Sequence, residues 1–126
     1  MNAYAQGDVI LVQVDDNIEI KPERVIVPSG HPVVLAEGEH TGHRHAFYDG
    51  ALLFRDPALA RDVPRELYIG HVRISIGGAL LEHGTGPGIR GDHDPIRIPA
   101  GTYVVRGQRE YSGRPAHETA TRRVED

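Results

Sequence analysis

The chain of 126 residues is long enough for one domain with a hydrophobic core and too short for two. Its formal net charge of −4 gives no indication of a general affinity for nucleic acid or for anionic membranes. Cysteine is absent, which excludes disulfides and thiolate metal sites, so any metal ion would have to be bound by nitrogen and oxygen atoms.

The first eight residues contain no basic segment followed by an apolar one, as a signal peptide would. No apolar run approaches the roughly 18 residues that a membrane-spanning helix needs. We therefore expect a cytoplasmic protein, although a secreted chain whose signal peptide had been removed would look the same.

Fifteen glycines and nine prolines divide the sequence into short apolar runs, a pattern typical of many short strands joined by tight turns. We expect strands at 9–14, 24–27, 33–36, 46–48, 51–54, 72–76, 79–83, 93–98 and 102–106. In the first of these, Ile10, Val12 and Val14 are expected to face the core. Asp49-Gly50 indicates a hairpin, and helical tendency is confined to residues 56–63, so we expect at most one short helix.

This number of short strands favours an all-β antiparallel sandwich or small barrel, and we expect a single jelly-roll barrel. The barrel domain is predicted to span residues 1–111. Residues 112–126 have almost no apolar side chains to bury, so we expect them to form a mobile C-terminal tail.

The segment 38–47 contains three of the eight histidines. His43 and His45 are spaced so that an extended strand would place both imidazoles on one face, because side chains alternate along a strand. Phe47 continues this face. Two histidines beside a core aromatic residue are typical of metal ligands inside a β-barrel.

A second pair, His83 and His93, flanks the glycine-rich segment 84–92. We expect the two flanking strands to pair antiparallel, which would bring these histidines together and close to the first pair. We therefore predict that His43, His45, His83 and His93 bind one divalent transition metal. Zinc, copper, nickel and ferrous iron all accept imidazole ligands, and the sequence does not distinguish among them.

Other polar residues leave the ligand set open. His40 is either a further ligand or a solvated loop residue. Four acidic residues are near enough in sequence to complete the ligand set or to accept a hydrogen bond from a ligating imidazole: Glu37, Asp49, Asp92 and Asp94. Three other histidines are expected to lie on the surface: His31, His71 and His117.

Two segments resemble the motifs of the cupins. Residues 38–49 contain a glycine, a short spacer, His43-Arg44-His45 and an acid, with the spacer one residue short and Asp49 in place of glutamate. Residues 98–101 resemble the Pro-X-Gly of the second motif, without the histidine that follows it in cupins. His83 and His93 would have to replace that histidine.

The cupin likeness implies a double-stranded β-helix, frequent dimers and a mononuclear metal, and it assigns no substrate. The same segments together with Gln108-Arg109-Glu110-Tyr111 resemble uncharacterised small bacterial proteins over most of residues 7–111. Residues 108–111 either border a site or form a last strand with solvated alternate residues.

Two hypotheses for the function remain. The first is a mononuclear metalloenzyme, with a coordination position open to water, dioxygen or substrate. The second is a non-enzymatic binding or assembly module, in which the histidines close a structural site or bind no metal and the surface binds a protein partner. Three histidines plus water would favour the enzyme, whereas four protein ligands would favour a structural site.

Overall fold

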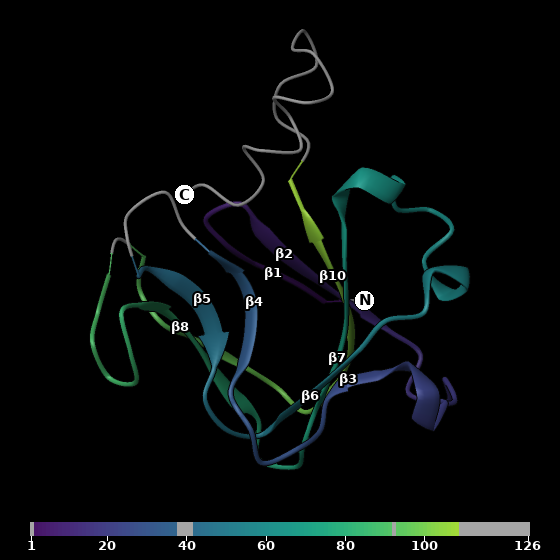
Figure 1. Ribbon diagram of the computed structural model, residues 1–126, viewed down its shortest axis with the longest axis horizontal. Coiled ribbons are helices and arrows are strands. Elements are labelled where there is room, and N and C mark those ends of the chain that lie inside the picture. The colour runs from purple at the N-terminus through teal and green to yellow at the C-terminus, as the bar shows by residue number, and fades with distance from the viewer. Residues whose placement is uncertain (1, 38–41, 92, 109–126) are drawn as a thin grey trace, which may run out of the picture.

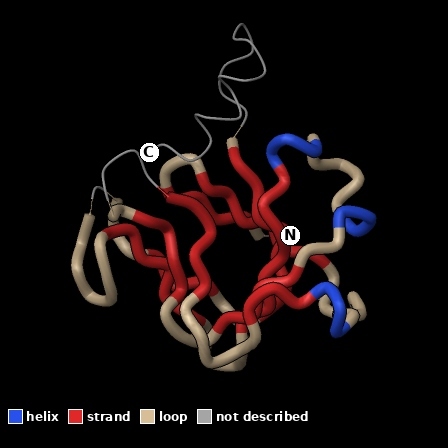
Figure 2. Tube along the Cα trace, viewed as in Figure 1, coloured by secondary structure: helices blue, strands red, loops and turns tan. Residues whose placement is uncertain are grey.

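The structure is a computed structural model that describes residues 2–37, 42–91 and 93–108. It is all-β and consists of two antiparallel sheets (Figures 1 and 2). Along the chain the strands are β1 (Ala3–Gln6), β2 (Val9–Val14), β3 (Val25–Val27), β4 (Val33–Glu37), β5 (Arg44–Phe47), β6 (Ala51–Phe54), β7 (Tyr68–Ile74), β8 (Ala79–Gly84), β9 (Ile96–Ile98) and β10 (Gly101–Gly107).

The six-stranded sheet has the order β1-β2-β10-β7-β6-β3, and the four-stranded sheet has the order β4-β5-β8-β9. Neither sheet, as far as the structure describes it, closes into a barrel by itself. The prediction of an all-β fold with antiparallel sheets is therefore confirmed, whereas the expected jelly-roll barrel is not.

One hydrophobic core joins the two sheets. The six-stranded sheet contributes residues such as Leu11, Val72 and Tyr103, and the four-stranded sheet contributes Phe47 and Leu81. These five side chains have no exposed surface. Because alternate residues of a strand face one side, Phe47 and Leu81 fix which face of β5 and β8 points inward.

The expected orientation of β2 was wrong. Val9 and Leu11 face the core between the sheets, whereas Val12 and Val14 pack against Val104 on the outer face. The segment between β6 and β7 covers part of this outer face. A strand that is covered on both sides carries apolar residues on both faces, as β2 does at residues 9–12, so its sequence does not reveal which residues face the main core.

Asp49-Gly50 does not form the expected hairpin, because β5 and β6 belong to different sheets. Gly50 has a φ of 78°, and a Cβ atom here would lie 3.2 Å from the Cβ of Ala79. The Asp-Gly pair thus provides a tight reversal that carries the chain from one sheet to the other. A turn signal predicts the reversal and not the pairing of the strands that flank it.

Helical structure in the described residues is limited to three single 3₁₀ turns, η1 (Pro22–Arg24), η2 (Pro57–Leu59) and η3 (Arg65–Leu67). The expected helix at residues 56–63 is thus one 3₁₀ turn, and the other two turns were not expected. No helix in the described part of the chain is long and apolar enough to cross a membrane. The predicted tail at residues 112–126 lies outside the described residues.

Candidate functional site

The structure brings the four predicted histidines together beside the pairing of β5 with β8. His45 lies directly opposite His83 in this pairing, and their ring centroids are 4.4 Å apart. The ring of His83 also lies 4.9 Å from that of His93 and 5.7 Å from that of His43. His83 is therefore the centre of the cluster. The expected antiparallel pairing of the flanking strands, β8 and β9, is confirmed.

Alternation along the strands explains this placement. His45 is two residues from Phe47, and His83 is two residues from Leu81, so both imidazoles continue the inward faces of their strands. Each of the two histidines is 1% exposed. His43 and His93 are partly exposed, so the cluster reaches from the end of the core toward the surface.

Gln6, on a strand that we did not expect, is the residue that fixes the ring of His45. Its side chain is 2% exposed, and its Nε2 donates hydrogen bonds to the carbonyl oxygens of Leu81 (3.0 Å) and Asp94 (2.8 Å). Carbonyl oxygens only accept hydrogen bonds, so these two contacts determine which end of the amide is nitrogen. The Oε1 atom of Gln6 lies 2.9 Å from Nδ1 of His45.

This hydrogen bond determines the tautomer of His45. The amide oxygen of Gln6 can only accept, so Nδ1 of His45 carries a proton, and in the neutral ring the lone pair is then on Nε2. Gln6 was not predicted from the sequence, because it is distant in the chain from both its partners, β8 and His45. A lone glutamine before the turn at Gly7-Asp8 gives no signal of its own.

The ring of His83 makes a different contact. The backbone N–H of His93 donates to its Nδ1 at 3.3 Å, which is long for such a bond. In this arrangement Nδ1 of His83 is the acceptor, so the proton of the neutral ring is on Nε2.

Gly91 holds the segment before β9 against the cluster. Its N–H donates to the carbonyl oxygen of His83 at 2.6 Å. A Cβ atom at residue 91 would lie 2.6 Å from the same oxygen and 3.1 Å from Nδ1 of His43. The backbone at residue 91 therefore lies so close to the histidines that only glycine, which has no Cβ atom, fits there without displacement of its neighbours.

Four acidic residues were considered as ligands, and the three that the structure describes lie on the surface. Glu37 and Asp49 are exposed, and Asp94 forms an exposed ion pair with Arg90 at 3.5 Å. Asp92 and His40 fall outside the described residues. Among the residues that the structure describes, no three histidine or acidic side chains are arranged to hold a metal ion.

Of the histidines expected on the surface, His31 is exposed and His117 lies outside the described residues, whereas His71 is fully buried. Its ring stacks on Phe54 at 5.0 Å, and its Nδ1 lies 2.7 Å from the hydroxyl of Tyr68. Burial lowers the pKa of His71 to about 4, opposed by the carboxylate of Asp56. The prediction failed because β7 is covered on both faces.

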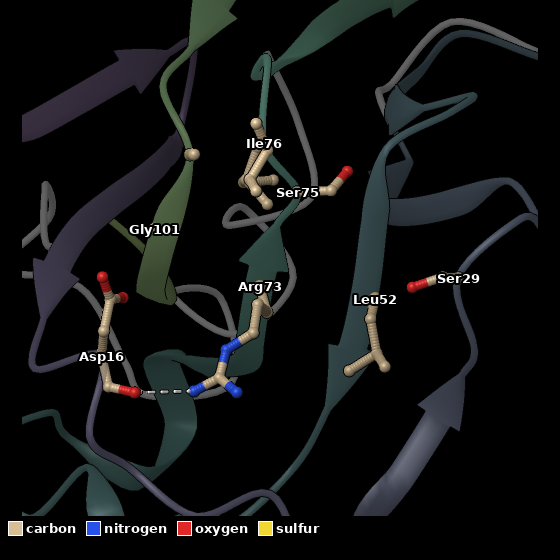
Figure 3. A pocket seen from close by; sticks show the side chains of 9 residues that line it. Asp16, Ser29, Leu52, Arg73, Ser75, Ile76 and Gly101 are labelled. Atoms are coloured by element: carbon tan, nitrogen blue, oxygen red, sulfur yellow. Dashed lines mark hydrogen bonds between the residues drawn. The ribbon is translucent and has the colours of Figure 1, made fainter.

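A pocket of 670 Å³ lies where β10 begins, at the end of the six-stranded sheet that is opposite to Gln6 (Figure 3). Arg73 lines it, and its guanidinium group donates to the carbonyl oxygens of Asp16 (3.2 Å) and Ile18 (2.9 Å) and to the hydroxyl of Thr102 (2.9 Å). Through these hydrogen bonds Arg73, which belongs to β7, connects the segment after β2 with β10. We assign the pocket no part in the histidine cluster.

No curated protein and no solved structure matches the chain. The model of a domain of unknown function, DUF8820, matches residues 5–108. This match extends from β1 to the end of β10 and includes Gln6 and the four clustered histidines. The chain belongs to the DUF8820 family.

Proposed function

We propose that the protein binds one divalent transition metal ion through imidazole nitrogens of His43, His45, His83 and His93. The hydrogen bond between Gln6 and His45 carries this proposal. An imidazole that ligates a metal commonly donates its other N–H to an oxygen acceptor, which fixes the ring and directs its lone pair. Gln6 provides this acceptor, and two backbone carbonyls hold the amide in the required orientation.

The histidine rings lie about as close together as imidazoles that share a metal ion, although their present orientation is not that of a metal site. Two imidazoles that share a metal ion at about 2.0–2.1 Å hold their ring centroids roughly 4.5–6 Å apart. The centroid of His83 lies 4.4–5.7 Å from those of His43, His45 and His93, and the centroids of His45 and His93 are 6.0 Å apart. The rings of His45 and His83 are stacked at an interplanar angle of 25°, so they would have to turn to direct their nitrogens at one ion. Nitrogen ligands of this kind suit zinc, copper, nickel and ferrous iron.

His83 is the ligand whose present contact has to change. Its Nδ1 faces the N–H of His93 at 3.3 Å, and coordination through this nitrogen would need that long contact to open. We therefore expect the backbone amide of His93 to report metal binding in a ¹⁵N-labelled sample titrated with zinc. A signal that stays in place at saturating zinc would exclude His83 Nδ1 as a ligand.

The finer architecture that we propose is a cupin-like jelly roll. The links from β5 to β6, from β7 to β8 and from β9 to β10 each carry the chain from one sheet to the other. Repeated crossing of this kind is typical of a jelly roll, in which two facing sheets are wound from one chain. In such a fold the metal would lie beside the core, near the N-terminal end of β5 and the C-terminal end of β8.

Thermal unfolding with and without zinc tests the metal site. A ligand that binds only the native state stabilises it by about 2.7 kcal/mol at a concentration one hundred times its Kd. We expect zinc to raise the melting temperature of the wild type and a chelator to reverse the rise. His45→Asn and the partly exposed His93→Asn should both reduce the response.

The matched control is His31→Asn, which changes an exposed histidine outside the cluster. It should respond to zinc as the wild type does. An unchanged melting temperature of the wild type, or an equal loss of response in His31→Asn, would refute the proposed site. A spectroscopic count of the nitrogen ligands of bound cobalt would separate a site with an open position from a closed structural site.

A further inference from the structure

A second candidate binding site lies on the outer face of the six-stranded sheet, away from the histidine cluster. The segment between β6 and β7, which contains η2 and η3, borders a pocket of 580 Å³. Arg55, Arg61, Arg65 and Tyr68 are among its lining residues, and no acidic residue lines it. Three positive charges thus gather at one pocket in a chain whose net charge is −4.

Each of these arginines is followed in the sequence by an acidic residue (Asp56, Asp62 and Glu66), so segment 55–66 has no net charge, but none of the three acids lines the pocket. Within the described ranges, the ion pair that the structure shows joins Arg90 to Asp94 and involves none of Arg55, Arg61 and Arg65. Asp56 is buried, and Asp62 lines an adjoining pocket of 270 Å³. The three guanidinium groups that line the pocket would each attract a bound anion.

One wall of the pocket is held in place by specific contacts. The Nε of Arg55 donates to the carbonyl oxygen of Ile69 at 3.0 Å, and its guanidinium carbon lies 5.2 Å from the ring centre of Tyr68. The hydroxyl of Tyr68 accepts a hydrogen bond from the backbone N–H of Asp56 at 2.9 Å and also contacts His71. A cation and an aromatic ring fixed in advance reduce the entropy that a ligand loses on binding.

We propose that this pocket binds a phosphate monoester. The planar guanidinium group matches phosphate oxygens with paired N–H donors, and several such groups suit a dianion better than a monoanion. Pro57, Val63 and Pro64 supply apolar lining for the organic part of the ester. The volume falls within the roughly 300–1,000 Å³ that small-molecule sites commonly have.

Calorimetric titration of the full chain with phenyl phosphate tests this proposal. We expect saturable binding of one molecule per chain, and a Kd at least tenfold higher in the double variant Arg61→Gln/Arg65→Gln. Both side chains are exposed, so this variant should fold. The control, Arg90→Gln/Arg97→Gln, removes the same charge from two exposed arginines elsewhere and should bind as the wild type does.

A second arm distinguishes a soluble ester from a lipid headgroup. Sedimentation with phosphatidylcholine vesicles, with or without phosphatidic acid, presents the same phosphate monoester on a membrane. Binding that depends on phosphatidic acid and is lost in Arg61→Gln/Arg65→Gln supports the site with a lipid as the source, whereas binding of phenyl phosphate alone assigns it to a soluble ligand. The proposal is overturned if neither probe binds, or if both double variants lose binding equally.

Discussion

At the scale of single residues, Gln6 shows how a polar side chain that is distant in the sequence can orient a histidine ring. Its amide joins β1, β8 and the segment before β9, and it places the proton of His45 on Nδ1. The histidines themselves could be found from the sequence, because alternate spacing and position around a loop are local features. Gln6 could not be found in this way, since its role arises only when the sheets meet.

Replacing Gln6 with leucine should therefore weaken metal binding. Loss of a residue that orients a ligating imidazole typically costs 10–100-fold in metal affinity, and we expect a loss of about this size. The carbonyls of Leu81 and Asp94 would also lose a donor, which should reduce the free energy of unfolding by about 1–3 kcal/mol. Competition titration with a zinc indicator measures the affinity.

The matched control is Gln13→Leu, which removes a partly exposed amide on β2 and leaves the cluster untouched. If both variants bind zinc as the wild type does, the hydrogen bond between Gln6 and His45 has no role in the site.

His71 should make the stability of the protein sensitive to acid. An unfolded histidine titrates near 6.5, whereas burial lowers the pKa of His71 to about 4. Between these values the unfolded chain takes up a proton that the native state does not, so the free energy of unfolding should fall as the pH falls from 6.5 to 4. The loss attributable to His71 should be about 3 kcal/mol.

Urea unfolding of wild type and His71→Phe at pH 7 and pH 4 isolates this effect. The other titrating groups contribute to both proteins, so the difference between the two pH profiles belongs to His71. We expect His71→Phe to lose less stability than the wild type on acidification. Parallel profiles would show that the native state protonates His71 as readily as the unfolded chain does.

At the scale of elements, the glycine-rich segment between β8 and β9 is a structural part of the candidate site and more than a linker. Gly91→Ala would force the new Cβ against the carbonyl oxygen of His83 and toward the ring of His43. We expect a loss of about 1–3 kcal/mol in the free energy of unfolding, typical of overpacking, together with weaker zinc binding.

Gly86→Ala is the control within the same segment. A Cβ here meets only the side chain of Ile89, at an ordinary distance of 3.7 Å, and Gly86 does not have a positive φ. The free energy of unfolding of this variant should lie within about 1 kcal/mol of the wild-type value, because Gly→Ala changes at unstrained positions have small effects. Equal effects of the two substitutions would mean that the close approach of Gly91 does not constrain the site.

The sequence predicted most strands, because apolar runs separated by glycine and proline mark them locally. It did not predict how strands pair, and Asp49-Gly50 illustrates the reason. The signal specifies a tight reversal, whereas the partner of each strand is decided by contacts across the core. The orientation of β2 failed for a related reason, since the segment that covers its outer face comes much later in the chain.

At the scale of the whole molecule, the family match ends at residue 108, and residues 112–126 contain almost no apolar side chains to bury. Removal of residues 112–126 should therefore change the free energy of unfolding by less than about 0.5 kcal/mol, as changes away from packed features usually do. Urea unfolding of the shortened chain measures this change. A truncated chain that fails to unfold cooperatively would place part of residues 112–126 in the folded domain.

The central claim is that imidazoles of this domain bind one metal ion, and equilibrium dialysis against zinc at pH 7.5 and pH 5 tests it most directly. We predict about one zinc ion per chain at pH 7.5 and little at pH 5, because protons compete for imidazoles, which titrate near 6.5 when free. A site dominated by carboxylates would retain zinc until roughly pH 4. Absence of bound zinc at pH 7.5, or equal occupancy at the two pH values, would contradict the claim.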